Sequence, residues 1–301
     1  MTDGDESVAC AICDVDDARV LSFRARWGQR VRTVACRRCD LVYANPRPGR
    51  ERLARFYRER IYTQYIDASG RFQERLLASS RTQARNTVDF FVGRAGQRLD
   101  GARVLEVGCG LGDFLVLARA AGARVLGLEL DGPYADFAEK QHGLSIARRR
   151  VEDLDTAARF DVIALFHVVE HLEDPVGVLA ALRPRLAPGG RLFIEVPDFM
   201  GPWRIPFTEF LRVEHLYNFS PETLGRVLAR AGFRVTRQDD DPFLLRVVAE
   251  PAPGERPALP RERHRRGVLR HVVTWRVRGR LLQPYYAARR RLSSATPESQ
   301  P

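Results

Sequence analysis

The stretch Val104–Leu115, which reads VLEVGCGLGDFL, decides the fold of this chain. A short apolar segment runs into Gly108, Gly110 and Gly112, and apolar residues at helical spacing follow. Because glycine has no Cβ atom, it adopts positive φ and lets backbone N–H groups approach a ligand at the N-terminus of the next helix. The layout predicts a strand, a glycine turn and a helix that together bind a nucleotide-like ligand.

Length and composition limit the number of domains and the class of protein that we expect. A chain of 301 residues can bury a full α/β core and still carry small additions. Its first residues, MTDGDESVAC, are polar and acidic, and no apolar run approaches the roughly 18 residues that cross a membrane. We therefore expect a soluble, cytoplasmic protein with one main domain.

The formal net charge of +11 raises nucleic acid as a partner. However, all but one of the 49 basic residues are arginine, the exception being Lys140, which is typical of a genome-wide codon bias. Eleven arginines also lie between Arg261 and Arg291 against the single Glu262, so this segment carries about +10 of the total. The rest of the chain is nearly neutral, and nucleic acid is not an expected partner.

Two C-x-x-C pairs precede the glycine turn: Cys10 with Cys13, and Cys36 with Cys39. Each pair offers two thiolates on one tight turn, and a hairpin of two short strands brings the pairs together, as a structural Zn²⁺ site requires. A disulfide pairing is one alternative, which a reducing cytoplasm disfavours, and free core cysteines are another. A ribbon this small needs its metal in order to fold.

Residues Arg50–Phe91 carry apolar side chains three or four positions apart, which predicts helix. The aromatics Tyr57, Tyr62 and Tyr65 either line a substrate lid or pack this helix on the main domain.

From Gly101 onwards, strand and helix patterns alternate, which predicts a largely parallel sheet covered by helices. The short connection Gln238–Pro242 suits an antiparallel final pair rather than a crossover. The expected strands are Ala102–Val107, Ala123–Leu130, Ser145–Val151, Phe160–Phe166, Arg191–Val196, Phe233–Arg237 and Phe243–Ala249, and the expected helices are Phe114–Ala121, Tyr134–His142, Pro175–Leu186 and Pro221–Ala231. The segment Pro197–Asn218 reads as irregular.

Open α/β folds bind their ligands at the edge formed by the carboxyl ends of the strands. Near the end of the second strand, Glu129 stands 21 residues beyond Gly108, where an acid accepts hydrogen bonds from both hydroxyls of a ribose. The end of the fourth strand delivers two histidines and a glutamate. The polar residues expected at this edge are Glu129, Glu152, Asp153, His167, Glu170 and His171.

Six motifs in order and in register resemble class I S-adenosylmethionine-dependent methyltransferases. They are Glu106–Gly112 (EVGCGLG), Glu129, Glu152-Asp153, Phe160–Ile163 (FDVI), His167–Leu172 (HVVEHL) and Leu186–Gly190 (LAPGG). The resemblance covers roughly Arg85 to Glu250 and implies a Rossmann-like, seven-stranded sheet with an antiparallel last strand. It also implies that S-adenosylmethionine binds at Glu106, Gly108, Gly110, Gly112, Glu129, Glu152, Asp153 and His167.

An NAD-dependent oxidoreductase is the nearest competing interpretation. Its sites usually show G-x-G-x-x-G, whereas here the glycines follow G-x-G-x-G and Glu106 precedes them. In the methyltransferase family the equivalent acid anchors the methionine end of the cofactor, which carries an ammonium group. A third alternative is a non-catalytic zinc and nucleic-acid-binding module, which would require a tail that binds RNA or DNA with steep salt dependence.

The four-cysteine ribbon before this core is similar to that of zinc-containing bacterial methyltransferases found beside sugar and polyketide tailoring enzymes. Their deoxysugar C-methyltransferases carry a His-Glu-His-Leu motif at the acceptor. The matching residues here are Glu214 and His215, with Val213 in place of the first histidine, and the chain is shorter. The resemblance implies a small-molecule, sugar or glycan-type acceptor, and O- versus C-methylation stays open. A lipid-linked acceptor would suit the basic helix near the C-terminus, if that helix lies on a membrane.

Methyl transfer requires an aligned acceptor and, for a hydroxyl or a carbon acid, removal of its proton. Histidine is the natural base because its pKa lies near neutrality. The candidates are His215, with Glu214 orienting it, and His171. Both His171 and His167 could instead shape the cofactor pocket.

Residues Arg263–Gln283 carry Val268, Val272 and Trp275 on one face of a helix and arginines on the other side. Such a helix either lies on an anionic membrane, at its inner face in the cell, or docks on the protein. The expected division of the chain is a zinc-binding ribbon at 1–48, a helical linker or lid at 49–100, the cofactor-binding core at 101–250, and a tail with this helix and a disordered end at 251–301.

Overall fold

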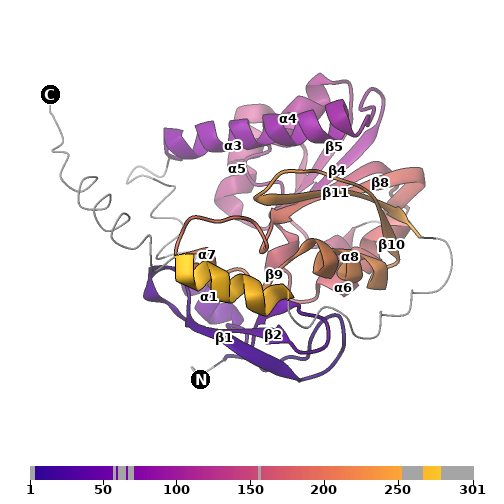
Figure 1. Cartoon of the computed structure of the whole chain (residues 1–301). Helices are drawn as coiled ribbons and strands as arrows, with labels where there is room; N and C mark the ends of the chain where they lie inside the picture. Colours follow the sequence, from indigo (N-terminus) through magenta and orange to yellow (C-terminus); the bar gives the residue numbers. More distant parts are fainter. Residues whose placement is uncertain are drawn as a thin grey trace, which may run out of the picture.

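The structure is a computed structural model that describes residues 4–56, 59, 66, 71–154, 157–252 and 267–278. These residues form a seven-stranded sheet and a four-stranded sheet, with helices packed on both faces of the larger one (Figure 1).

The seven-stranded sheet has the order β10-β11-β8-β7-β4-β5-β6. The pairs from β8 to β6 are parallel, whereas β11 runs antiparallel to both β8 and β10. This topology confirms the predicted α/β fold and its antiparallel last strand. The strands are β4 Arg103–Val107, β5 Arg124–Leu128, β6 Ile146–Ala147, β7 Phe160–Phe166, β8 Leu186–Pro197, β10 Phe233–Gln238 and β11 Leu244–Pro251.

Helices cover the two faces of this sheet in separate groups. In Figure 1, α3, α4 and α5 lie on one face, and α6 and α8 lie on the other. The aromatic side chains of Phe91, Phe166 and Phe193 stack between α3 and the sheet. The helices are α1 Arg50–Phe56, α3 Glu74–Val88, continued by a π-helical turn Asp89–Arg94, α4 Asp113–Ala120, α5 Gly132–His142, α6 Pro175–Leu182 and α8 Pro221–Arg230.

The four-stranded sheet belongs to the N-terminal ribbon, with one strand from far along the chain. Its order is β1 (Ala18–Arg24), β2 (Arg30–Cys36), β3 (Val42–Ala44) and β9 (Tyr217–Asn218), all antiparallel. The sequence predicts an irregular segment where β9 and the short helix α7 (Phe207–Phe210) lie, so that prediction is wrong for these residues.

Two helix boundaries also differ from the sequence prediction. Helix α6 ends at Leu182, and a 3₁₀ turn, Arg183–Arg185, leads directly into β8. The Pro-Gly-Gly sequence at 188–190 is therefore part of β8, although it follows a predicted helix, Pro175–Leu186. Between Arg50 and Phe91, helix is described over α1, Glu59, α3 and the start of the π-helical turn, and the prediction of helix is wrong at residues 71–73. Tyr57, Tyr62 and Tyr65 lie outside the described residues.

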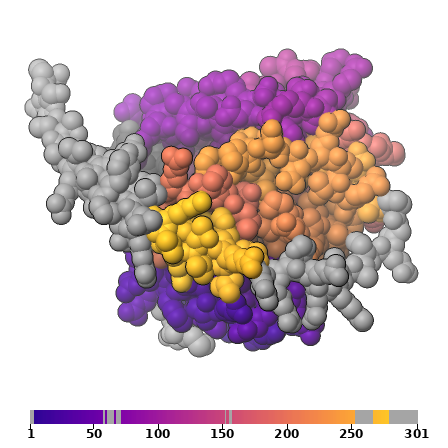
Figure 2. Space-filling model, in the orientation of Figure 1, coloured from indigo at the N-terminus to yellow at the C-terminus, as the bar shows by residue number. Residues whose placement is uncertain are grey.

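A helix at 267–278 packs over the ribbon and the segment that carries α7 (Figure 2). Val268, Val272 and Trp275 are buried there, and the Trp275 indole N–H donates to the carbonyl oxygen of Ile205 at 2.7 Å. Residues 263–266 and 279–283 of the expected helix lie outside the described part of the chain. Within that part, no helix has both the length and the apolar character needed to cross a bilayer.

Candidate functional site

The glycine turn joins β4 to α4 at the carboxyl edge of the sheet. Gly108, Gly110 and Gly112 all have positive φ, as the sequence pattern predicts. A Cβ atom on Gly110 would face open space, with its nearest neighbour, the Tyr134 ring, 4.0 Å away. A ligand can therefore approach the backbone at Gly110, and a side chain there would fill its space.

Glu129 follows β5 and lies against the same turn. Its carboxylate accepts hydrogen bonds from the Gly110 N–H at 2.9 Å and from the Asp131 N–H at 2.8 Å. These bonds fix the carboxylate beside the turn, where an acid can also receive ribose hydroxyls.

Glu106 precedes the turn, and its side chain is 4% exposed. Its Oε2 atom has no hydrogen-bond partner among the described residues. Burial, reinforced by the carboxylates of Glu129 and Asp113, raises the pKa of Glu106 well above its usual range. A buried acid with one oxygen atom that lacks a donor fits a cationic ligand group, such as the ammonium of S-adenosylmethionine.

Glu152 and Asp153 lie together in a 3₁₀ turn, Val151–Asp153, that follows β6. Asp153 is exposed, and the side chain of Glu152 lies outside the described part. The backbone therefore brings both residues near the strand ends without defining a contact.

His167, the first residue beyond β7, has a φ of 55°, which is unusual for a residue with a side chain. Its Nε2 lies 3.1 Å from Glu195 Oε1, and its Nδ1 lies 3.4 Å from Glu170 Oε1. Burial disfavours the charged ring, but the two carboxylates outweigh burial and raise the pKa of His167 to about 10. His167 is therefore a cation held between two acids at neutral pH.

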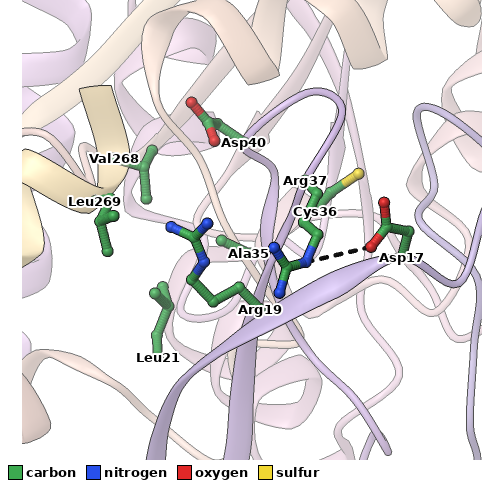
Figure 3. Close-up of a pocket in the computed structure, with 9 residues that line it drawn as sticks. All are labelled: Asp17, Arg19, Leu21, Ala35, Cys36, Arg37, Asp40, Val268 and Leu269. Atoms are coloured by element: carbon green, nitrogen blue, oxygen red, sulfur yellow. Dashed lines mark ion pairs between the residues drawn. The ribbon is translucent and has the colours of Figure 1, made fainter. Parts of the chain in front are cut away.

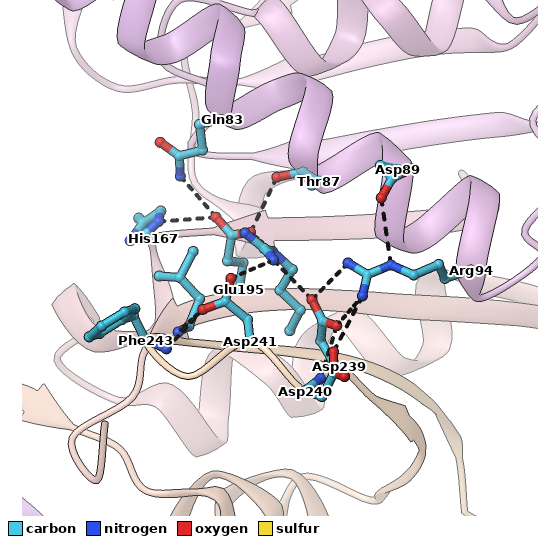
Figure 4. A network of polar contacts seen from close by, with 12 residues as sticks. Gln83, Thr87, Asp89, Arg94, His167, Glu195, Asp239, Asp240, Asp241 and Phe243 are labelled. Carbon is cyan, nitrogen blue, oxygen red and sulfur yellow. Dashed lines mark hydrogen bonds and ion pairs between the residues drawn. The ribbon is translucent and has the colours of Figure 1, made fainter. Parts of the chain in front are cut away.

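Glu195 on β8 is fully buried and was not singled out by the sequence analysis. Gln83 Nε2 donates to it at 2.9 Å and Thr87 Oγ1 at 3.2 Å, both from α3, and Arg246 Nε on β11 pairs with it at 2.5 Å (Figure 4). No sequence motif marks this residue, because its partners come from three distant segments.

His171 and His215 meet although 44 positions separate them. Their rings lie edge to face, with centroids 4.8 Å apart. His171 Nδ1 lies 2.9 Å from the backbone carbonyl oxygen of Glu214, so Nδ1 carries the proton and Nε2 has a free lone pair. Burial holds the pKa of His215 well below its usual range, and the nearby His171 and Arg212 lower it further.

The loop that follows β7 connects this pair to the glycine turn. Val168, three residues before His171, packs so closely on Gly108 that a Cβ there would lie 2.6 Å from its Cγ2. Glu214 is buried, its Oε1 lies 3.5 Å from Arg212 Nη1, and its Oε2 has no hydrogen-bond partner in the described part of the chain. The structure thus brings His171, Glu214 and His215 together.

Phe72 is a further residue that sequence reasoning missed. Its ring packs on Tyr134 and Phe137 of α5, with centroid distances of 4.9 and 5.3 Å. Tyr134 is also the nearest neighbour of the open space at Gly110. The segment before α3 therefore reaches the rim of the glycine turn.

The four cysteines of the ribbon lie together, with all sulfur atoms within 4.8 Å of one another and none in a disulfide. Cys10 Sγ and Cys39 Sγ are 3.5 Å apart. Hydrogen bonds from the Cys10 and Cys39 thiols lower the pKa of Cys36 to about 2. This arrangement fits a tetrahedral thiolate site.

A cavity of about 180 Å³ lies between the ribbon and the helix at 267–278 (Figure 3). Arg19, Asp40 and Leu269 are among the residues that line it. Cys36 is the one predicted site residue that borders this cavity, so we assign the cavity no part in the chemistry.

Comparison with known proteins decides between the remaining interpretations. The family model described as "Methyltransferase domain" matches residues 73–238, more than half of the chain. The chain belongs to this methyltransferase family. Membership of this family favours the methyltransferase interpretation over the oxidoreductase and the non-catalytic module.

The methyltransferase is similar in sequence to two curated relatives named ubiquinone biosynthesis O-methyltransferase. The protein from Leptothrix cholodnii is 35% identical over 106 residues, which are 32% of this chain and 45% of that protein. The protein from Xylella fastidiosa strain 9a5c is 38% identical over 104 residues, 32% of this chain and 42% of that protein. The methyltransferase therefore spans less than half the length of these relatives.

A solved structure supports the fold. The 1,6-didemethyltoxoflavin-N1-methyltransferase of Burkholderia thailandensis, with bound 1,6-didemethyltoxoflavin and S-adenosylhomocysteine, superposes with a TM-score of 0.52 at 22% identity. The match covers 70% of the methyltransferase and 96% of that chain.

Proposed function

We propose that this enzyme transfers the methyl group of S-adenosylmethionine to a hydroxyl group of a small-molecule acceptor beside His171 and His215. The observation that carries the proposal is the contact between these two rings, next to the loop whose Val168 packs on Gly108. Because Gly108 belongs to the cofactor turn, an acceptor beside the rings would lie close to the methyl donor. The named O-methyltransferase relatives favour oxygen as the acceptor atom.

On this proposal, S-adenosylmethionine supplies an electrophilic methyl group, and the chain aligns and activates the acceptor. Glu106 receives the ammonium group of the cofactor, Glu129 receives its ribose, and the turn at Gly108, Gly110 and Gly112 admits it. Glu152, Asp153 and His167 line the same pocket. Three observations support these roles: the Glu106 oxygen atom without a hydrogen-bond partner among the described residues, the hydrogen bond from Gly110 to Glu129, and the open space at Gly110.

The two rings activate the acceptor, in the simplest form by removal of its proton by His215. Glu214 orients the site, because its backbone carbonyl fixes the tautomer of His171. A positioned base contributes about 10²–10⁴-fold to a rate. Substitution of one of the two histidines should therefore lower the turnover rate enough to be measured.

A turnover screen tests this function. Production of S-adenosylhomocysteine is measured with catechols, other phenols, nucleotide sugars and lipid-linked sugars. His215→Asn is expected to lower turnover by about 100-fold or more without weakening cofactor binding, whereas His142→Asn, a histidine substitution on α5, leaves turnover unchanged. Turnover only on acceptors without a hydroxyl, or full turnover by His215→Asn, would contradict the proposal.

The four-cysteine cluster is proposed to bind a structural Zn²⁺ through Cys10, Cys13, Cys36 and Cys39. Two arginines of α8 support the backbone of both knuckles: Arg226 Nη1 donates to the Cys39 carbonyl at 3.1 Å, and Arg230 Nη1 donates to that of Ile12. The ion would hold the ribbon against the methyltransferase core.

A third proposal concerns the helix at 267–278. It docks through one face, yet Leu269, Val273 and Val277 are 37%, 54% and 56% exposed, and they recur every fourth residue along another face. Arg270 and Arg278 are exposed beside them. An apolar stripe flanked by arginines suits contact with an anionic membrane, which would bring the cytoplasmic enzyme to a lipid-linked acceptor.

A further inference from the structure

Glu170 is a buried acid that the reaction outlined above does not use. Its side chain is 1% exposed, and neither Oε1 nor Oε2 has a hydrogen-bond partner among the described residues. The nearest charge is His167, whose Nδ1 lies 3.4 Å from Oε1, and His167 is shared with Glu195. A buried carboxylate is costly unless a cation or a set of donors compensates it.

Two imidazoles complete a ligand set around this acid. One ligand atom each from Glu170, His171 and His215 lies within 4.8 Å of the others. His171 donates its Nδ1 proton to the carbonyl oxygen of Glu214, which leaves Nε2 free. A metal-ligating histidine almost always donates its other ring N–H to a carbonyl or a carboxylate in this way.

A second acid beside the rings also offers an oxygen atom to a cation. Glu214, next in sequence to His215, is buried and has an oxygen atom without a hydrogen-bond partner in the described residues. Its other oxygen lies 3.5 Å from Arg212, the positive group that faces it. The positive charge of His167 is shared between Glu170 and Glu195, and Glu195 also pairs with Arg246. Both oxygen atoms of Glu170 and one of Glu214 therefore lack a hydrogen-bond donor among the described residues and can accept a cation.

We propose that Glu170, His171 and His215 bind a divalent cation at the acceptor side of the methyltransferase. Two imidazoles and one carboxylate suit Mn²⁺, Fe²⁺ or Zn²⁺, whereas four thiolates select Zn²⁺, so the two sites of this chain differ in the ions that they accept. Three protein ligands leave coordination positions open for oxygen atoms of an acceptor.

The role of the cation rests on the proposed function. An acceptor hydroxyl that coordinates the cation loses its proton to solvent water more readily, because the metal stabilises the oxygen anion. That oxygen then forms its bond to the methyl carbon as the bond between this carbon and sulfur breaks. With the ion bound, His171 and His215 act as ligands, and the cation activates the hydroxyl in place of a histidine base. Acceptors with two adjacent oxygen atoms would bind best, because they can occupy two positions.

Electron paramagnetic resonance with Mn²⁺ tests the site without any methyl transfer. The full chain is first loaded with one equivalent of Zn²⁺, which the four thiolates bind in preference to imidazole and carboxylate, and unbound Zn²⁺ is removed so that the second site stays free. The free Mn²⁺ signal is then followed as protein is added. We expect the wild type to bind Mn²⁺ with one ion per chain. Glu170→Gln and His215→Asn should each weaken this binding by about 100-fold or more, since even outer partners of a metal ligand contribute 10–100-fold.

His142→Asn is the matched control, because it removes a histidine outside the set, and it should bind Mn²⁺ as the wild type does. Thermal melting and S-adenosylhomocysteine titration of the same samples establish that each variant is folded. Absence of Mn²⁺ binding by folded wild type, or wild-type binding by both folded ligand variants, would overturn the inference. Wild-type Mn²⁺ binding together with turnover only on acceptors without a hydroxyl would instead remove the proposed function and leave the metal site standing.

Discussion

At the scale of single residues, Glu195 joins the cofactor edge of the sheet to its last strand. The acid is buried between α3, His167 and β11, and Arg246 bonds both to it and to Asp239 at 2.9 Å. Arg94 pairs with the same Asp239 at 2.6 Å. The network therefore holds β8, β11 and the end of α3 in one arrangement behind His167 (Figure 4).

Replacing Arg246 with methionine is expected to destabilise the protein strongly. The change leaves Glu195 and Asp239 buried without their main cation, which costs about 3–5 kcal/mol in the free energy of unfolding. Arg191→Met on the neighbouring strand is the control, because its pair with Glu250 is partly exposed and contributes at most about 1 kcal/mol. Urea unfolding at neutral pH measures both, and equal losses would contradict a dominant role for the buried pair.

The same pair predicts a dependence on pH. Burial favours protonation of Glu195, but His167 and Arg246 outweigh burial and lower its pKa to about 2. Because the folded pKa lies below the unfolded value, this stabilisation is complete above about pH 4.5 and is lost as the pH falls toward 2. The difference between wild type and Arg246→Met should shrink over that range.

At the scale of elements, the glycine turn and the order of strands follow from local sequence. Strand β7, Phe160–Phe166, has the predicted bounds because its apolar run, Val162–Phe166, suits a parallel strand buried on both faces. Strand β9, with its two residues, was not predictable, because it exists only through pairing with β3, more than 170 positions earlier. The meeting of His171 with His215 was missed for the same reason, although each residue had been singled out.

Zn²⁺ is expected to stabilise the fold of the ribbon, because its four cysteines lie together and none of them forms a disulfide. The double variant Cys36→Ser/Cys39→Ser should lose its one zinc ion per chain, as measured by elemental analysis, and should melt at lower temperature. Because β9 follows His215 directly and pairs with β3, turnover should fall further than cofactor affinity.

Cys109→Ser is the control for that measurement. Cys109 lies in the glycine turn and is the cysteine outside the cluster, so this variant should keep its full zinc content. Retention of zinc by the double variant would show that the cluster does not bind it.

At the scale of the whole molecule, charge and apolar surface meet at the C-terminal helix. The segment between Arg261 and Arg291 carries about +10 of the net charge of +11. The helix at 267–278 is seated on the ribbon, as Figure 2 shows, and exposes its second apolar stripe. This face is therefore the expected membrane contact.

Flotation with vesicles of phosphatidylcholine and phosphatidylglycerol measures this contact. Val273→Asp should reduce the bound fraction more than Thr274→Asp, because both residues are exposed and gain the same charge but only Val273 belongs to the apolar stripe. Equal flotation of the two variants, or no flotation of the wild type, would exclude the stripe as a membrane anchor.

The central claim is that S-adenosylmethionine binds at the turn formed by Val104–Leu115, and calorimetric titration with S-adenosylhomocysteine tests it most directly. We expect one site per chain in the wild type, loss of binding in Gly110→Arg, whose side chain would fill the open space beside Tyr134, and unchanged binding in Gly225→Arg, an equally open glycine on α8. Absence of binding by the wild type, or full binding by Gly110→Arg, would contradict the account.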